Sequence, residues 1–210
     1  MPSYQLLSLD IWDTILRRDC HPDAIKVETA AVLLERHGGE LQETYRNPRA
    51  LFRLRQDIER QLGAAKKAQG FDDEYAIQDV FRELLARAYR EPLPEAAAEE
   101  LAARLVAEEL AAEQRHVYLD PGIEAKIDSI PHERLVCISD FYADEAFLRE
   151  LLTAAGFSKP LERVLVSCDF GVNKRSGRLF EEAEKLLNVT PAAHMHLGDN
   201  AYSDVEVPKR

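Results

Sequence analysis

The chain has 210 residues, which is enough for one ordinary domain with a modest insertion and excludes a fibre or a multi-domain machine. Its 46% hydrophobic and 31% charged residues suit a soluble globular protein, and no stretch approaches the roughly 20 consecutive apolar residues that span a bilayer. Because 27 basic and 38 acidic residues give a net charge of −11, the protein repels polyanions, and we expect no nucleic acid partner.

The N-terminal segment and the cysteines bear on cellular location. The opening MPSYQLLSLD has no positively charged stretch before its apolar residues and no small-residue cleavage site after them, so we expect no secretory signal. Cys20, Cys137 and Cys168 are far apart and form no C-x-x-C motif, which predicts reduced thiols. We therefore expect a cytoplasmic protein, in which Cys137, inside an apolar run, belongs to the core.

The first predicted element is a buried strand over residues 4–9, which is mostly apolar and ends abruptly at Asp10. Residues 22–114 then show helical spacing of apolar side chains almost throughout. The predicted helices cover residues 25–37, residues 51–62 (ended by Gly63), residues 77–89 (ended by Pro92) and residues 95–114. The last is amphipathic, with a leucine stripe and a glutamate-rich solvated face. This block is predicted to be a helical bundle.

After Asp120-Pro121-Gly122 the pattern alternates between helices and short strands. Helices are predicted over residues 123–129, 144–155 and 177–187, and strands over residues 134–138, 164–166 and 194–197. Strands separated by helices of about ten residues indicate βαβ units and a parallel sheet. The predicted fold class is α/β, with a doubly wound parallel sheet in a core of residues 1–18 and 116–210, and an all-helical insert of residues 19–115 after the first strand.

Polar side chains follow each predicted strand of this sheet. The first strand ends at Asp10, the second at Ser139-Asp140, the third is followed by Lys174, and the fourth ends at Gly198-Asp199-Asn200 with Asp204 just beyond. Because the carboxyl ends of parallel strands meet at one edge, these groups are predicted to converge there. Clustered carboxylates repel one another without a cation, so the set predicts a hard metal ion with oxygen ligands, Mg²⁺ above all, and a lysine and a hydroxyl placed to hold phosphate.

The order Asp-x-x-x-Thr, Ser, Lys and Gly-Asp-x-x-x-x-Asp resembles the haloacid dehalogenase superfamily of hydrolases, over residues 4–204. The resemblance implies a Rossmann-like core with a mobile helical cap, and it implies that Asp10 is a nucleophile that forms an aspartyl-phosphate. It further implies that Ser139 and Lys174 bind the transferred phosphoryl group. Mg²⁺ would be held by Asp10, Asp199, Asp204 and the backbone carbonyl of Trp12, and substrate would contact Thr14, Arg18 and Asn200.

One departure concerns the residue two positions after Asp10. Most phosphatases of the family have an acid there that moves protons, and this chain has Trp12, with an acid only at Asp13. The loss of a positioned proton donor costs about 10² to 10⁴ in rate. The pattern is similar to a subgroup reading Asp-x-Phe-Asp-Thr, with Trp12 in the aromatic place and Arg18 as its arginine. That resemblance implies a linked or associated glycosyltransferase domain in glycan assembly.

These observations predict an Mg²⁺-dependent phosphatase acting on a small phosphorylated metabolite, such as a sugar phosphate or a nucleotide. One alternative is a weakly active or inactive domain with a structural or regulatory role in a larger glycan-assembly protein. Another is a dehalogenase-like or phosphonatase-like hydrolase, which the intact Gly198-Asp199 pair disfavours, since dehalogenases of the family use no metal. The sequence also stops six residues after Asp204, in Val-Pro-Lys-Arg, and we hypothesise a segment cut from a longer polypeptide or a truncated member with an open sheet edge.

For several residues the sequence allows both a structural and a functional role. Asp13 either caps the turn that follows or substitutes for the missing acid, and capping is favoured. Asp140 and Asp144 are predicted to start a helix rather than bind metal. His194 and His196 share one strand face, where packing is favoured over zinc. Residues 46–67 carry seven basic side chains, which either attract an anionic substrate or form a solvated face with Arg55 paired to Glu59.

Overall fold

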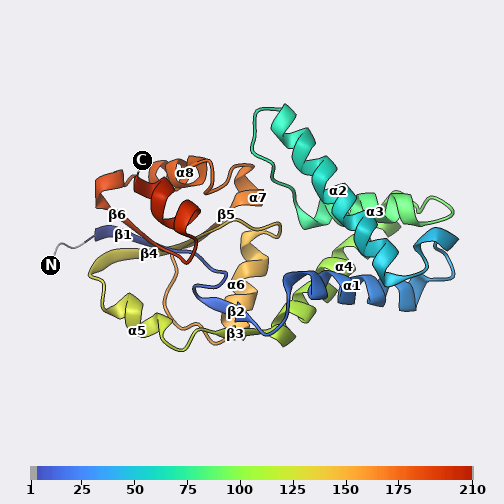
Figure 1. Cartoon of the computed structure of the whole chain (residues 1–210), viewed down its shortest axis with the longest axis horizontal. Coiled ribbons are helices and arrows are strands. Elements are labelled where there is room, and N and C mark those ends of the chain that lie inside the picture. The colour runs from blue at the N-terminus through green and yellow to red at the C-terminus, as the bar shows by residue number, and fades with distance from the viewer. Residues whose placement is uncertain (1–3, 210) are drawn as a thin grey trace. The chain divides into compact units, whose positions relative to one another are not determined.

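The computed structural model describes residues 4–209, so Met1 to Ser3 of the opening segment and Arg210 of the final Val-Pro-Lys-Arg lie outside the described residues. The chain forms two compact units, one made of residues 1–18 and 117–210 and the other of residues 19–116. Figure 1 labels the elements of both. Among the helices of the described part, none is long and apolar enough to cross a membrane.

The first unit contains a four-stranded parallel sheet. Its strands are β1 (Tyr4–Leu9), β4 (His132–Ser139), β5 (Arg163–Val166) and β6 (His194–Leu197), in the order β5-β4-β1-β6. The chain runs outward from β1 to β4 and β5 and then returns to the other side of β1 for β6, so the sheet is doubly wound, as predicted. In such a sheet the ligand site lies beyond the carboxyl ends of the strands, near the point where the strand order reverses.

Helices cover both faces of this sheet. Figure 1 shows α8 (Arg178–Leu187) on one side, and α5 (Ile123–Asp128) and α6 (Glu145–Ala154) on the other. The α8 side is a continuous apolar cluster in which Leu6, Val136 and Ile138 of the strands pack with Leu179 and other residues of α8. Leu7 and Leu9 alternate to the opposite face and are fully buried. Cys137 is also fully buried in β4, as predicted for a core residue, and burial raises the pKa of its thiol.

Short elements complete the first unit. An antiparallel pair, β2 (Leu16–Arg18) and β3 (Val117–Leu119), joins the segments on either side of residues 19–116. Each strand has three residues, which is too short for a period-two pattern to reveal it in the sequence. The helix α7 (Ser167–Phe170) follows β5 directly, and η2 (Pro191–Ala193), η3 (Ala201–Glu206) and η4 (Val207–Lys209) flank β6. Val207 packs into the apolar cluster under α8.

The second unit is the predicted helical bundle. It consists of α1 (Pro22–His37), α2 (Pro48–Ala68), α3 (Ile77–Ala88) and α4 (Glu95–His116), with a short turn η1 (Glu43–Tyr45). The prediction that Gly63 ends the second helix is wrong, because α2 continues for five residues beyond it. A side chain at Gly63 would place its Cβ 2.8 Å from the carbonyl oxygen of Asp73. Glycine is therefore needed for close packing of a neighbouring loop and does not mark a helix end.

A buried ionic network holds this bundle together. Arg55 of α2, 2% exposed, donates to both carboxylate oxygens of Glu109 on α4 and, at 2.8 Å, to Glu59. Lys26 of α1 also donates to Glu59, at 2.8 and 2.9 Å. The predicted pairing of Arg55 with Glu59 is confirmed, but the prediction that the pair lies on a solvated face is wrong, because both residues are buried. Burial removes Arg55 from any contact with substrate. Attraction of an anionic substrate by the rest of residues 46–67 stays a prediction.

Candidate active site at the carboxyl edge of the sheet

Asp10 is placed by the end of β1. Its backbone N–H donates to the carbonyl of Leu197 at 2.9 Å, which ties the end of β1 to the end of β6. The chain then makes a tight turn, in which the Asp13 N–H donates to Leu16 at 2.8 Å and Asp13 has a left-handed backbone with φ of +57°. Aspartate tolerates this region better than most residues, because its short polar side chain interacts locally. Asp10 is left 6% exposed, facing the sheet edge.

Lys174 reaches Asp10 from the loop between α7 and α8. Its Nζ donates to Asp10 Oδ1 at 2.6 Å and to Asp204 Oδ1 at 2.7 Å, and it is 3% exposed. The loop is fixed by Asp140, whose Oδ1 accepts from the Lys174 backbone N–H at 2.8 Å. The prediction that Asp140 starts a helix is therefore wrong, whereas Asp144 does cap α6 by accepting from Phe147 N–H. Asp140 directly follows Ser139 at the end of a predicted strand, and this position in the sequence could have indicated a role at the site.

Asp204 lies in the turn of helix η3 that follows β6. Asn200 caps this helix, its Oδ1 accepting from the backbone N–H groups of Tyr202 and Ser203 at 3.0 Å each. In return Asp204 Oδ2 accepts from Asn200 N–H at 3.0 Å. Gly198 makes room for this arrangement, because a Cβ there would lie 2.4 Å from Asp204 Cγ. The Gly198-Asp199 pair thus has a steric basis, since no larger residue leaves space for the Asp204 carboxylate.

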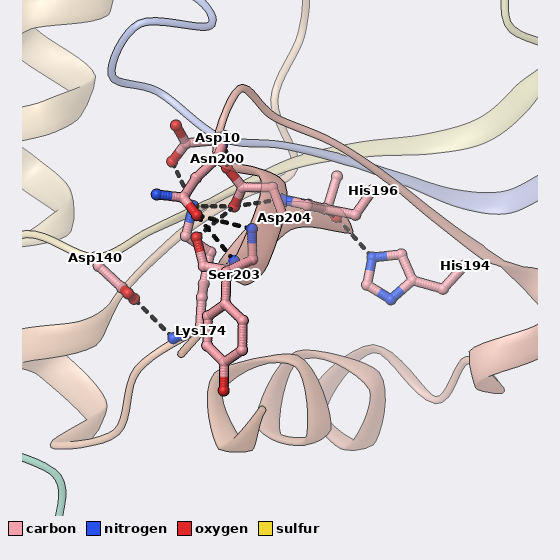
Figure 2. A network of polar contacts seen from close by, with 10 residues as sticks. Asp10, Asp140, Lys174, His194, His196, Asn200, Ser203 and Asp204 are labelled. Carbon is pink, nitrogen blue, oxygen red and sulfur yellow. Dashed lines mark hydrogen bonds and ion pairs between the residues drawn. The ribbon is translucent and has the colours of Figure 1, made fainter. Parts of the chain in front are cut away.

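The three predicted metal-ligand carboxylates converge as the strand-end argument predicted. Oxygens of Asp10, Asp199 and Asp204 all lie within 4.8 Å of one another. Figure 2 shows Asp10, Lys174 and Asp204 joined by ion pairs, with Asp140 holding the Lys174 backbone. Three carboxylates and one ammonium leave excess negative charge, and oxygen donors at this spacing suit a hard divalent cation such as Mg²⁺.

The two buried carboxylates have opposite electrostatic environments. Burial raises the pKa of Asp10 to about 6, and Lys174 only partly offsets this effect. Burial also acts to raise the pKa of Asp204, but hydrogen bonds from His196 and Lys174 hold it well below its usual range. Burial acts to lower the pKa of Lys174, and Asp10 and Asp204 together raise it above the ordinary lysine value. Lys174 is therefore a fixed cation between the two acids.

A cavity of about 540 Å³ opens at this edge, and its lining includes Asp10, Lys174 and the three acids Asp140, Asp199 and Asp204. Trp12, Asp13 and Asn200 also line it. Arg175 and Tyr202 line it as well, and sequence reasoning missed both. Their positions in the sequence could have indicated a role at the site, since each lies within two residues of a predicted site residue. Arg175 is the second basic side chain of the lining, which matters for the charge of any ligand that enters.

The remaining predicted site residues lie around this cavity without lining it. Ser139 is fully buried at the end of β4, and its hydroxyl has no hydrogen-bond partner among the described residues. Thr14 Oγ1 is likewise unpartnered, and Thr14 lines a neighbouring hollow of about 310 Å³. The Arg18 guanidinium lies 3.5 Å from the centre of the Trp12 ring, on which Phe141 also packs at 4.9 Å. Trp12 is thus in contact with both a cation and an aromatic ring.

Two other clusters of titratable groups lie outside the lining of this cavity. His194 and His196 are packed, as predicted, and within the described residues neither belongs to a group of potential metal ligands. In the second unit Asp19, Cys20 and His116 lie together, with His116 Nδ1 2.7 Å from Asp19 Oδ1. Asp19 is exposed and already paired with His116.

Comparison with known proteins supports this assignment of the fold. No protein-family model matches the chain. Over 144 residues, 69% of its length, the chain is 33% identical to a phosphoserine phosphatase of Thermus thermophilus, and it spans 57% of that relative. Among solved structures, a 2-haloacid dehalogenase of Pseudomonas syringae superposes with a TM-score of 0.68 at 18% identity, covering 98% of this chain and 82% of the other. A putative HAD-hydrolase of Bacillus subtilis bound to magnesium superposes with a TM-score of 0.56 at 17% identity, covering 99% and 85%.

The chain therefore has the fold of the haloacid dehalogenase superfamily of hydrolases, as its motifs predicted. The curated relative is a phosphatase, and the two solved structures are similar to this chain in fold. Because a shared fold does not fix a reaction, the activity has to be argued from the site.

Proposed function

We propose that this chain is an Mg²⁺-dependent phosphohydrolase that acts through an aspartyl-phosphate on a small phosphorylated metabolite, such as a sugar phosphate or a nucleotide. The observation that carries the proposal is the convergence of Asp10, Asp199, Asp204 and Lys174 at one cavity, with the three acids within 4.8 Å of one another. The sequence relationship to a phosphoserine phosphatase supports phosphoryl chemistry.

The donor set fits Mg²⁺, which prefers carboxylate oxygens and few protein ligands. Asp10, Asp199 and Asp204 would hold it, together with the backbone carbonyl of Trp12. When bound, Mg²⁺ would supply positive charge that favours the ionised form of Asp10 and offsets negative charge on the phosphoryl oxygens. Burial raises the pKa of Asp10 to about 6 although Lys174 acts to lower it, so a further positive charge would favour the ionised carboxylate.

In the proposed reaction the ionised Asp10 carboxylate attacks phosphorus, and the bond from phosphorus to the leaving oxygen breaks. The products of this step are an aspartyl-phosphate and an alcohol, whose oxygen takes up a proton. Water then cleaves the acyl-phosphate, which releases phosphate and restores the carboxylate. Lys174, held at 2.6 Å from Asp10, would stabilise negative charge on the phosphoryl group. Ser139 does not line the cavity, and its proposed role as a donor to a phosphoryl oxygen rests on the motif and on its unpartnered hydroxyl.

The cavity supports a small, charged substrate. Its volume of about 540 Å³ is in the range of small-molecule sites. Its lining is dominated by acids, with Lys174 and Arg175 as the basic side chains, so a free phosphate ester would be repelled unless a divalent cation accompanies it. We therefore expect phosphate release to depend strictly on added Mg²⁺.

The test is a panel of sugar phosphates, phosphoamino acids and nucleotides, assayed for phosphate release with Mg²⁺ and with a chelator. Asp10→Asn should abolish release, while the matched control Asp128→Asn, at an exposed residue paired with Lys159, should not alter it. Quenching the reaction and reducing the acyl-phosphate with borohydride should convert Asp10 to homoserine, detectable by peptide mass. Equal phosphate release by Asp10→Asn and the unchanged protein would overturn the proposal.

Trp12 favours a second candidate function, a weakly active domain that serves a linked or associated glycosyltransferase in glycan assembly, as the Asp-x-Phe-Asp-Thr subgroup implies. The indole occupies the place of the usual proton-moving acid and is packed against Arg18 and Phe141. The proposed setting is the cytoplasm, consistent with three cysteines that form no disulfide among the described residues. Mg²⁺ binding without phosphate release from any substrate would favour this role, and metal-independent halide release from 2-haloacids would instead favour a dehalogenase.

A further inference from the structure

A line of polar side chains crosses the buried α8 face of the sheet, behind the candidate site. Ser8 of β1 lies opposite His196 of β6, and the next pair on the same face is Leu6 with His194. Ser8 is fully buried, and the His194 and His196 side chains are 4% and 1% exposed. Phe180 of α8 packs against both rings, with its centre 4.8 Å from that of His196.

These residues form a continuous chain of hydrogen bonds that we call the histidine column, made of Glu184, His194, Ser8, His196 and Asp204. Glu184 Oε1 lies 2.9 Å from His194 Nδ1, and the Ser8 hydroxyl lies 2.7 Å from both His194 Nε2 and His196 Nδ1. His196 Nε2 lies 3.2 Å from Asp204 Oδ1. Figure 2 shows His196 next to Asp204, His194 farther from it, and the contacts that lead on to Lys174 and Asp10.

Counting protons gives the column a direction. An ionised carboxylate only accepts hydrogen bonds, so His196 can donate to Asp204 only in the tautomer that carries its proton on Nε2. A neutral His196 then accepts from the Ser8 hydroxyl at Nδ1, and the Ser8 oxygen in turn accepts from His194 Nε2–H. Lys174 already donates to the same Asp204 oxygen, so a neutral imidazole there avoids a second full positive charge.

We propose that His196 is a positioning residue for Asp204, kept in its Nε2–H tautomer by Ser8 and His194. The inference rests on the proposed metal-binding role of Asp204. Asp204 Oδ1 is held by His196 and Lys174, and Oδ2 is held by the Asn200 N–H, so both oxygens are fixed in direction. Partners of this kind orient ligands and typically change metal affinity by about 10- to 100-fold when removed.

The alternative is that these histidines only fill the core, and suitable variants separate the two roles. His196→Leu removes the donor, His196→Gln keeps an N–H near the Nε2 position, and Ser8→Ala removes the group that fixes the tautomer. His132→Leu is the control, because His132 begins β4 at the opposite end of the sheet, pairs with Tyr4 and contacts the carbonyl of Ile130. A purely structural role would lower stability in these variants without a specific effect on metal binding.

The experiment measures Mg²⁺ affinity by calorimetry without substrate, and the His196 tautomer by ¹⁵N long-range NMR. We expect Nε2–H in the unchanged protein, a mixture of tautomers in Ser8→Ala, an affinity loss of about 10- to 100-fold in His196→Leu, recovery in His196→Gln and no change in His132→Leu. An Nδ1–H tautomer, or unchanged affinity in His196→Leu, would overturn the inference, as would failure of the unchanged protein to bind Mg²⁺. Normal Mg²⁺ binding with these effects, but without phosphatase activity, would overturn only the proposed function.

Discussion

The replacement Gly198→Ala tests whether the Gly-Asp motif exists to make room for Asp204. The added Cβ would lie 2.4 Å from Asp204 Cγ and Oδ2 and 2.6 Å from its Cβ, well inside van der Waals contact. Because Asp204 cannot keep its position, it should lose one of its hydrogen bonds, the one to Lys174 or the one to His196. Overpacking costs about 1 to 3 kcal/mol, and loss of one hydrogen bond to a charged group costs about 1.5 to 3 kcal/mol. The expected loss of unfolding free energy is therefore about 2.5 to 6 kcal/mol.

The assay is thermal unfolding with a chelator and with saturating Mg²⁺, combined with calorimetric Mg²⁺ titration. A loss of about 2.5 kcal/mol should lower the melting temperature by at least about 5 °C in a chain of this size. The Mg²⁺-induced increase in melting temperature should also shrink, because Asp204 no longer reaches the metal. Gly39→Ala is the matched control, since nothing lies within 4 Å of a Cβ at Gly39. Melting temperature and Mg²⁺ affinity equal to those of the unchanged protein would refute the steric argument.

Three further predictions follow from buried or strained groups. Because burial raises the pKa of Asp10 from 3.8 to about 6, the contribution of Asp10 to the stability of the metal-free protein should be largest below about pH 4 and should fall by about 3 kcal/mol as the pH rises through 6. The difference in unfolding free energy between the unchanged protein and Asp10→Asn, measured by urea unfolding at several pH values, should show this fall. Asp13→Asn keeps a side chain suited to φ of +57°, so phosphate release should fall less than about tenfold, and a loss near 10² would identify Asp13 as the proton donor. Arg55→Met leaves the fully buried Glu109 carboxylate without this cation and should lower the free energy of unfolding, measured in urea, by about 3 to 5 kcal/mol. Arg104→Met, which removes a cation from an exposed pair, should lower it by less than about 1 kcal/mol.

The sequence predicted the strand ends because the signal for them is local. A short apolar run followed at once by an acid, as at Asp10, or by Gly198-Asp199, predicts both the end of a strand and the edge at which it ends. The helical bundle was predictable for the same reason, since apolar spacing needs no knowledge of neighbours. Gly63 shows the limit of this reasoning, because its need for close approach to Asp73 depends on tertiary packing.

The groups behind the site were missed because their roles depend on which strands are neighbours. Ser8 is a single polar residue in an apolar strand, and His194 and His196 share a face, but nothing in the sequence indicates that β6 pairs with β1. Only that pairing places the Ser8 hydroxyl between the two imidazoles. Asp140 is similar, because its contact with the Lys174 backbone joins residues 34 positions apart.

The two acids next to Lys174 differ in pKa and in how firmly they are held. Asp204 is held by His196, Lys174 and the Asn200 N–H, which keep its pKa low and its carboxylate ionised and fixed before any ligand arrives. Asp10 shares Lys174, but burial raises its pKa to about 6, so its charge is the one that a cation would stabilise most. An ionised, fixed carboxylate next to one with a raised pKa is the arrangement expected under the proposed function, in which Asp204 would bind the metal and Asp10 would act as the nucleophile. The hydrogen bond from His196, at the end of the histidine column, contributes to this difference because it lowers the pKa of Asp204 only.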